Sequence, residues 1–310
     1  MQIFTDISSP LKFQRPVITI GTFDGVHIGH RAILDELNMQ AAAINGNAAV
    51  VTFNPHPRIT LGQQVYLLNT QQEKREIFEK AGISSLIEIP FTPEFSKLSA
   101  EGFIEFLSKM IKPERVIIGY DHGFGHKRSG NIAQFHKMGE KFGFKVARVD
   151  ERIAGDSKVS STIIRWLLQQ GDVEKANALL GYCYPVSGQV VRGNQIGKLI
   201  GYPTANLYVE DPNKLIPAMG VYASKIILRG EEFIGMTNIG MRPTINAHKL
   251  TIETNIFGFN EDIYYETLTV KLIKRIRNEK KFAGLDFLQK QLQYDKEAVL
   301  EIMGEQPDSQ

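Results

Sequence analysis

Residues Val17 to His30 read V-I-T-I-G-T-F-D-G-V-H-I-G-H, and this stretch decides the fold of the first half of the chain. Val17–Ile20 is a short apolar run with β-branched residues, which predicts a buried strand. Glycines then interrupt the run, and apolar residues recur at helical spacing from Ile28. His27 and His30 therefore stand where a strand turns into a helix. Free N–H groups and the helix dipole make such a turn favourable for a nucleotide phosphate.

Short apolar runs and helical patterns alternate from there to about residue 181. The expected strands are Val17–Ile20, Ala48–Thr52, Leu86–Ile89, Arg115–Ile118 and Lys145–Val149. The expected helices are Ile28–Ile44, Gln71–Ala81, Ala100–Met110, Ile132–Phe142, one through Trp166 and Leu168, and Val173–Leu180. This alternation predicts βαβ units and a doubly wound parallel sheet. Ligands bind at the carboxyl ends of the strands in such sheets, so the residues that follow each strand are candidates for a site.

Three further polar segments follow expected strands. They are F-N-P-H-P at 53–57, the loop G-Y-D-H-G-F-G-H-K-R-S-G at 119–130, and V-S-S-T-I-I-R at 159–165. Each has a simple structural alternative: a stiff surface turn, an exposed glycine-rich loop and an ordinary capped helix start. Arg165 stands one turn beyond the cap, from where a guanidinium can reach a phosphate bidentately.

Composition sets wide bounds. The chain has 310 residues, which favours two domains, and 43% hydrophobic with 23% charged residues is ordinary for a soluble protein. A net charge of +2 gives no reason to expect nucleic acid or a membrane as a partner. A single cysteine, Cys183, and the lack of a signal-peptide pattern or a long apolar run lead us to expect a cytoplasmic protein. The oligomeric state is left open.

Strands replace helices near residue 183. The expected strands are Val186–Val191, Val221–Leu228, Phe233–Ile239, Leu250–Phe257 and Tyr264–Lys274. An amphipathic helix follows from about Leu285. Successive strands without helices between them predict a small antiparallel β-barrel with a terminal helix. We therefore expect domains at 1–182 and 183–310.

Polar residues in the second half offer two candidate groups. Pro203, Thr204 and Asn206 lie in P-T-A-N, and a hydroxyl with an amide oxygen suits Mg²⁺, although a turn leading into a strand is the simpler interpretation. Strand alternation places Glu253 on the face opposite Ile252, where it can serve as a base or be merely solvated. Gly197-Lys198 is not a Walker A loop, because the glycine spacing is wrong and no Ser or Thr follows the lysine.

The four N-terminal motifs together resemble the nucleotidyltransferase half of bacterial bifunctional riboflavin kinase/FAD synthetases. Their order and spacing match, whereas a lone H-x-G-H is shared with other adenylyl- and cytidylyltransferases and class I aminoacyl-tRNA synthetases. The resemblance implies an FMN adenylyltransferase with His27 and His30 as catalytic residues. It also implies binding of ATP or flavin by Gly21, Phe23, Asp24, Gly25, Asn54, His56, Asp121, Arg128, Ser160, Ser161, Thr162 and Arg165.

The second half is similar to the riboflavin kinase domain of the same family, through the glycine-rich loop, P-T-A-N, G-M-R-P-T, I-E-T and I-R-N-E-K-K-F. The resemblance implies that Thr204 and Asn206 hold Mg²⁺ and ATP and that Glu253 is the general base. Further implied ATP or flavin contacts are Gly193, Gly197, Lys198, Pro203, Arg242 and Arg277. The chain departs from the usual pattern of this family at Lys198 and at 246–249. It also departs from the pattern at Tyr265, where a glycine is common.

The implied function is two transfers on one chain. ATP first phosphorylates riboflavin to FMN with release of ADP, and a second ATP then adenylylates FMN to FAD with release of pyrophosphate. Three alternatives remain at this stage: a monofunctional FMN adenylyltransferase, a non-catalytic flavin or nucleotide sensor, and a cytidylyl- or pantetheine-phosphate adenylyltransferase.

Overall fold

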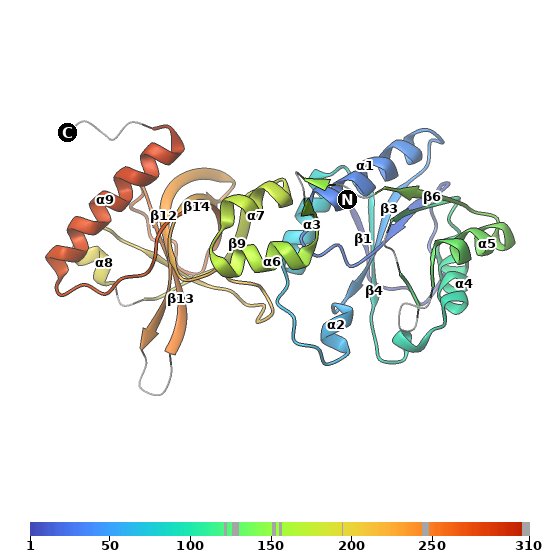
Figure 1. Ribbon diagram of the computed structural model, residues 1–310, viewed down its shortest axis with the longest axis horizontal. Helices are drawn as coiled ribbons and strands as arrows, with labels where there is room; N and C mark the ends of the chain where they lie inside the picture. Colours follow the sequence, from blue (N-terminus) through green and yellow to red (C-terminus); the bar gives the residue numbers. More distant parts are fainter. Residues whose placement is uncertain are drawn as a thin grey trace. The chain divides into compact units, whose positions relative to one another are not determined.

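The computed structural model describes residues 1–120, 123–125, 130–150, 153–154, 157–193, 195–243 and 248–305 (Figure 1). These residues form two compact units. The first consists of Met1–Leu67 and Gln71–Ser160, and the second of Leu68–Thr70 and Ser161–Gln310.

A six-stranded parallel sheet forms the centre of the first unit. Its order is β1-β4-β3-β2-β5-β6, with β1 at Gln2–Phe4, β2 at Val17–Ile20, β3 at Ala48–Asn54, β4 at Ser85–Pro90, β5 at Arg115–Gly119 and β6 at Lys145–Val149. From β2 the chain proceeds outward to β3 and β4, then crosses back to β5 on the other side of β2. The strand order therefore reverses beside the carboxyl end of β2, which is where doubly wound sheets bind ligands.

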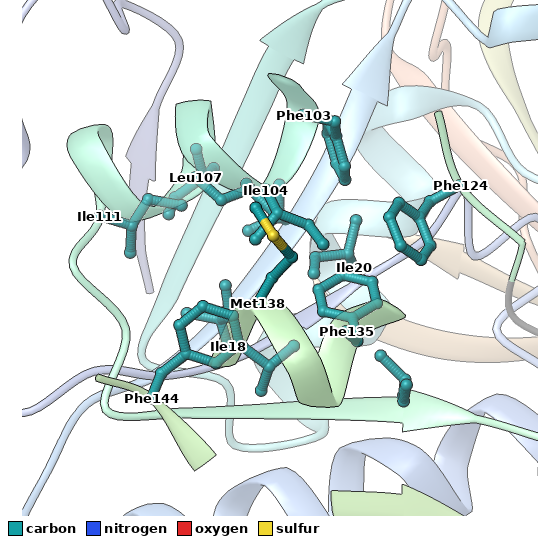
Figure 2. Packing of buried hydrophobic residues seen from close by; sticks show 14 of the residues in the cluster. Ile18, Ile20, Phe103, Ile104, Leu107, Ile111, Phe124, Phe135, Met138 and Phe144 are labelled. Carbon is teal, nitrogen blue, oxygen red and sulfur yellow. The ribbon is translucent and has the colours of Figure 1, made fainter. Parts of the chain in front are cut away.

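Helices cover both faces of this sheet because strand residues alternate between them. Ile18 and Ile20 point to the face covered by α4 and α5, where they meet Phe103 and Phe135 (Figure 2). Val17 belongs to the opposite core with α1 and α3. The helices of this unit are α1 at Ile28–Ala42, α2 at Pro57–Thr60, α3 at Gln71–Lys80, the short η1 at Phe95–Lys97, α4 at Ala100–Met110 and α5 at Ile132–Phe142.

A closed antiparallel barrel forms the centre of the second unit, in the order β10-β13-β12-β11-β14-β9. Its strands are β9 at Tyr184–Val191, β10 at Ala205–Tyr208, β11 at Gly220–Leu228, β12 at Glu231–Pro243, β13 at His248–Ile256 and β14 at Thr267–Arg277. Four helices accompany them: α6 at Ser161–Gln170, α7 at Val173–Leu180, α8 at Ile196–Leu199 and α9 at Leu285–Met303. Val299 of α9 packs against Val221, Ala223 and Met236 on the outside of the barrel. A separate pair, β7 at Ile153–Ala154 and β8 at Ser157–Lys158, forms a two-stranded sheet.

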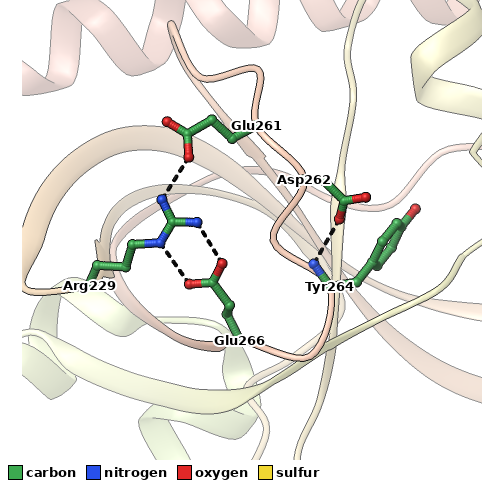
Figure 3. A network of polar contacts seen from close by, with 5 residues as sticks. All are labelled: Arg229, Glu261, Asp262, Tyr264 and Glu266. Carbon is green, nitrogen blue, oxygen red and sulfur yellow. Dashed lines mark hydrogen bonds and ion pairs between the residues drawn. The ribbon is translucent and has the colours of Figure 1, made fainter.

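An ion-pair cluster fixes the connection between β13 and β14 (Figure 3). Arg229 donates to both carboxylate oxygens of Glu266 at 2.8 and 2.6 Å and to Glu261 at 2.6 Å. Within the same connection, Asp262 accepts from the backbone N–H of Tyr264 at 3.0 Å. Tyr264 is thereby held where its hydroxyl accepts a hydrogen bond from Gln195 at 3.2 Å.

The structure confirms the predicted parallel sheet, barrel and terminal helix. Four short strands, β1, β7, β8 and β10, were not predicted, and β14 begins at Thr267 rather than at Tyr264. The domain boundary at residue 183 stays a prediction, since α6 and α7 fall in the same compact unit as the barrel.

Candidate active sites

The turn after β2 is built to leave backbone groups and two imidazoles at the edge of the sheet. Gly25 has a φ of +87°, which favours glycine, while Phe23 at +48° and Val26 at +34° adopt left-handed backbone that non-glycine residues rarely use. The turn is fixed at one end by the Gly21 N–H, which donates to the carbonyl of Val51 in β3 at 3.0 Å. Phe23 is buried, and its ring contacts Phe78 edge-on. Such a strained turn persists because the packing around it determines it.

His27 and His30 form a stacked pair at the start of α1. Their ring centroids lie 3.7 Å apart with an angle of 15° between the planes. His27 is the N-cap of α1, and its Nδ1 accepts the backbone N–H of His30 at 3.3 Å. Accepting that bond requires Nδ1 to be unprotonated, so the neutral His27 ring carries its proton on Nε2. A Cβ on Gly29 would lie 3.2 Å from the His27 ring, so the glycine in H-I-G-H leaves room for the cap.

The electrostatic environment keeps the second histidine neutral. Burial is the main cause that holds the pKa of His30 well below its ordinary value of 6.5, and the charge of Lys74, or of His27 when it is protonated, acts in the same direction. The Nδ1 atom of His30 is buried and has no hydrogen-bond partner within the described part of the chain. A neutral imidazole pair at a helix start can donate N–H bonds to a phosphate, as the dipole of α1 favours.

Other predicted residues of the first site lie at strand ends or outside the described residues. Asn54 is exposed at the end of β3, and the Asn54–Pro55 peptide bond is cis. His56 is the N-cap of α2, where its Nδ1 accepts the N–H of Arg58 at 3.2 Å. The β3 end lies at the same edge of the sheet as the turn after β2, because the two strands are parallel neighbours. Asp121 and Arg128 lie outside the described residues.

The segment from Ser160 to Arg165 opens α6. The helix begins at Ser161, so Ser160 occupies the N-cap position that the sequence predicts for one of these two serines. Thr162 is exposed, while Ser161 and Arg165 are partly buried. This geometry fits the predicted capped helix start, and the phosphate-binding role of these residues remains a prediction.

In the barrel, a single row across three strands contains two of the predicted kinase residues, Asn206 and Glu253. Asn206 of β10 pairs directly with Glu253 of β13, which pairs in turn with Asn238 of β12. Paired residues in neighbouring strands point to the same face, so these three side chains lie side by side. Ile252 points to the opposite face and is buried, as the alternation predicts. The candidate base and the candidate metal ligand come from separate motifs, and strand pairing makes them neighbours.

The surrounding loops leave space for these side chains. A Cβ on Gly193 would lie 2.6 Å from the Cγ atom of Asn206, so only a residue without a side chain fits there without displacing the amide. A Cβ on Gly197 would overlap the carbonyl of Tyr202. The amide of Asn255 donates to the carbonyl of Pro203 at 2.6 Å, which attaches the P-T-A-N turn to β13.

Two arginines near this site are engaged in ion pairs. Arg242 donates to Glu253 at 2.6 Å, and both side chains are about a quarter exposed (30% and 23%). Arg277, at the end of β14, donates through Nε and Nη2 to the buried Asp295 of α9 at 2.9 and 2.7 Å. Asp295 of α9 therefore orients the side chain of Arg277, and the contact of Arg277 with flavin stays a prediction. Lys198 is exposed on α8.

The residues present fit the implied Mg²⁺ in their chemistry. Thr204 and Asn206 supply hard oxygen donors, and the carboxylate of Glu253 is the cross-strand neighbour of the amide. The space opposite Asn206 is kept clear by Gly193. Thr204 is partly buried just before β10 begins.

Sequence reasoning missed Lys74, which contacts the turn after β2. It stands in a polar run beside Glu73, which suggests a solvated helix face. The available signal was its spacing of four from Phe78, which places it on the buried face of α3.

Comparisons with known proteins match both halves. A family model described as FAD synthetase matches residues 10–163, and one described as riboflavin kinase matches residues 180–303. A bifunctional riboflavin kinase/FMN adenylyltransferase of Listeria monocytogenes is 37% identical over 91% of this chain and 90% of its own length. The protein of the same name from Escherichia coli strain K12 is 33% identical over 93% of each chain.

A solved structure covers nearly the whole fold. The crystal structure titled macrolide-efflux protein from Streptococcus pneumoniae has a TM-score of 0.86 and 30% identity, and covers 96% of this chain and 97% of its own. Among the described helices of our chain, none has the length and apolar character needed to cross a bilayer.

These matches favour the two-step function over the alternatives of a single transferase or a sensor. The resemblance seen in the motifs is thus confirmed across both halves of the chain. The chain belongs to the family of bifunctional riboflavin kinase/FMN adenylyltransferases, with a FAD synthetase domain followed by a riboflavin kinase domain.

Proposed function

We propose that His27 and His30 stabilise the charge that develops during adenylyl transfer. An oxygen of the FMN phosphate attacks the α-phosphorus of ATP, and the bond from that phosphorus to the oxygen bridging the α- and β-phosphates breaks. The nucleophile is already an anion, so the step needs alignment and charge stabilisation rather than a strong base. Neutral imidazole N–H groups at the start of α1 supply donors for the α-phosphate and the departing pyrophosphate.

The remaining residues of the first site would hold the two substrates. Gly21, Asp24 and Gly25 line the turn after β2, and Asn54 and His56 follow β3. Asp121, Arg128 and the start of α6 complete the set that family resemblance implies. Backbone N–H groups in the turn and guanidinium groups together suit a triphosphate.

Glu253 would act in the first reaction as a general base. Riboflavin presents a neutral alcohol, so removal of its proton assists attack on the γ-phosphorus of ATP, and ADP leaves. The guanidinium of Arg242 holds the carboxylate of Glu253 in place at 2.6 Å. Thr204 and Asn206 would hold Mg²⁺, which when bound neutralises phosphate charge.

One observation carries this proposal. Asn206 and Glu253, for which the family resemblance implies roles in metal binding and in catalysis, are direct cross-strand neighbours in the barrel. A base and a metal ligand for the same phosphate must lie within a few ångströms of each other, and the strand register supplies that proximity.

We further propose that the partners are small molecules: riboflavin, FMN and ATP as substrates, and FAD, ADP and pyrophosphate as products. No nucleic acid or membrane partner is needed for this chemistry. A cytoplasmic location fits a single cysteine and a nucleotide substrate.

Chromatography of products from riboflavin, ATP and Mg²⁺ tests the kinase site. The wild-type chain should form FMN and FAD, and Glu253→Gln should form FMN at least about 10²-fold more slowly, the usual range for a general base. Glu253→Gln supplied directly with FMN should still form FAD at the wild-type rate, which controls for folding. Wild-type FMN formation by Glu253→Gln would exclude Glu253 as the base.

A further inference from the structure

A buried lysine lies beside the histidine pair, and the chemistry described above gives it no role. Lys74 is only 8% exposed and projects from α3 one turn before the fully buried Phe78. Its Nζ donates to the carbonyl of Thr22 and to Oγ1 of Thr52, both at 3.4 Å. The Thr52 hydroxyl in turn donates to the same Thr22 carbonyl at 3.4 Å. Lys74 thus connects α3 and β3 to the turn that precedes His27.

Burial disfavours the charge of Lys74, although the carboxylates of Asp24 and Glu88 favour it. Both hydrogen-bond acceptors are neutral oxygens at long distance. Of the nearby carboxylates, Glu88 is bound bidentately by Arg75 at 2.8 and 2.7 Å. Burial lowers the pKa of Lys74 to about 8, although Asp24 and Glu88 pull it upward. An apolar side chain would fill this space at less cost, so packing alone does not account for the lysine.

A polyanionic substrate would add to this compensation, which is outweighed by burial in the free chain. The turn after β2 is where the triphosphate and the FMN phosphate are proposed to meet, and Lys74 places a positive charge directly behind it. The charge of Lys74 also affects the histidine pair, because it lowers the pKa of His30. The charge of Lys74 therefore acts on the turn and on the imidazole from within the same buried cluster.

We propose that Lys74 is a positioning residue for adenylyl transfer, which fixes the Thr22 turn against β3 and sets His30 in its neutral, donating form. This inference rests on the proposed role of His27 and His30. Lys74 acts through the turn carbonyl and through its charge. The transfer step itself is unchanged: the FMN phosphate oxygen forms the new bond, and pyrophosphate leaves.

The proposal implies a pH dependence in which all groups facing Lys74 take part. These are Asp24 of the turn, Glu88 of β4, Arg75 of α3 and His30 of α1. In the free enzyme Lys74 loses its proton above about pH 8, so kcat/KM for FAD formation should fall there. Removal of the charge should also raise the pKa of His30 toward 6.5 and move the acid limb of that profile to higher pH.

Three variants of the full chain test this inference. Lys74→Met removes the charge, Lys74→Arg keeps it, and Lys80→Met changes an exposed lysine at the end of the same helix as a matched control. We expect Lys74→Met to lower kcat/KM for FAD formation about 10–100-fold, the loss typical of a mispositioned site. Lys74→Arg should retain most activity and lose the decline above pH 8. All three should make FMN from riboflavin at the wild-type rate.

An NMR titration of the His30 imidazole gives a readout independent of activity, with His30→Gln identifying the signals. Its midpoint should rise in Lys74→Met and stay unchanged in Lys80→Met. Wild-type FAD formation with an unshifted titration in Lys74→Met would overturn the role of Lys74. Retained FAD formation in the double variant His27→Ala/His30→Ala would instead overturn the proposed function, so the two failures are distinguishable. Loss of FMN formation in both Lys74 variants would identify a folding defect and contradict a positioning role.

Discussion

At the scale of single residues, the surroundings of His27 and His30 favour the neutral form of each ring. The Nδ1 atom of His27 caps α1, and His30 is kept neutral mainly by burial, with the charge of Lys74 acting in the same direction. Both rings therefore offer neutral N–H donors, the form that the proposed role in phosphate binding requires. The motif H-x-G-H combines three functions within four residues, because the cap, the space left by Gly29 and the stack all depend on the spacing.

The depressed pKa of His30 predicts a titration well below pH 6.5. An ordinary histidine is half protonated at 6.5, whereas His30 should be almost entirely neutral there, which ¹H–¹⁵N NMR of the imidazole measures. The unfolded chain binds that proton at 6.5 and the folded chain does not, so His30 lowers the stability of the fold as the pH falls below 6.5. A midpoint at 6.5 would show that the ring is not desolvated as described.

A second residue-scale prediction concerns Tyr265, one of the departures from the family pattern. Its φ is +69° and its side chain is 65% exposed, which explains why glycine is common at this position. Tyr265→Gly should relieve left-handed backbone that costs about 1–2 kcal/mol, offset in part by the flexibility of glycine in the unfolded chain. We expect a net gain of about 1 kcal/mol, which thermal unfolding of the barrel unit measures.

The matched control for that substitution is Tyr208→Gly. Tyr208 is also exposed but lies in β10 with ordinary strand backbone, so glycine there should lower the melting temperature. Equal destabilisation by both substitutions would contradict the account of Tyr265.

At the scale of elements, strand register brings residues of the proposed kinase site together. Pairing of β10 with β13 brings Asn206 beside Glu253, and the last residues of β9 and the loop after it leave room through Gly193. On the other edge of the site, α9 orients Arg277 through Asp295, which is only 1% exposed. The side chains of the proposed site are thus held by several different elements of the second unit.

Gly193→Ala tests this dependence on close packing. A Cβ there must displace the amide of Asn206, and a shift of about 1 Å at a reacting site can cost on the order of 10²-fold in rate. We expect FMN formation to fall by about 10–100-fold while FAD formation from FMN is unchanged. Gly284→Ala is the control, since the nearest heavy atom to its added Cβ lies 3.9 Å away. Wild-type FMN formation by Gly193→Ala would show that Asn206 is not needed in its observed position.

The elements also show what sequence can and cannot predict. The long periodic α4 was predicted with its observed bounds because burial of one face dictates the pattern, and the short β2 was predicted because all four of its residues are buried and form an apolar run. The four residues of β10 are too few for alternation to appear, although they carry Asn206. The contact between Asn206 and Glu253 depends on register between strands nearly fifty residues apart, which no local pattern encodes. Lys74 was missed because the polar residues around it in the sequence suggest a solvated helix, although this face of α3 is buried.

At the scale of the whole molecule, the two proposed catalytic groups lie in separate compact units, although Ser161, Thr162 and Arg165 of the proposed adenylyl-transfer site fall in the second unit. The histidine turn and its core belong to the first unit, and the row from Asn206 to Asn238 belongs to the second. FMN is the product of one site and the substrate of the other. Separate cores predict that damage to one set of catalytic groups leaves the other reaction intact.

The most direct test of this account is the pair of initial rates measured with the double variant His27→Ala/His30→Ala. With riboflavin, ATP and Mg²⁺, this variant should form FMN at close to the wild-type rate. With FMN, ATP and Mg²⁺, it should form FAD at least about 10²–10³-fold more slowly, the usual cost of a lost electrostatic contact in a transition state. Equal loss of both rates, or unchanged FAD formation, would contradict the assignment of the histidine pair to adenylyl transfer alone.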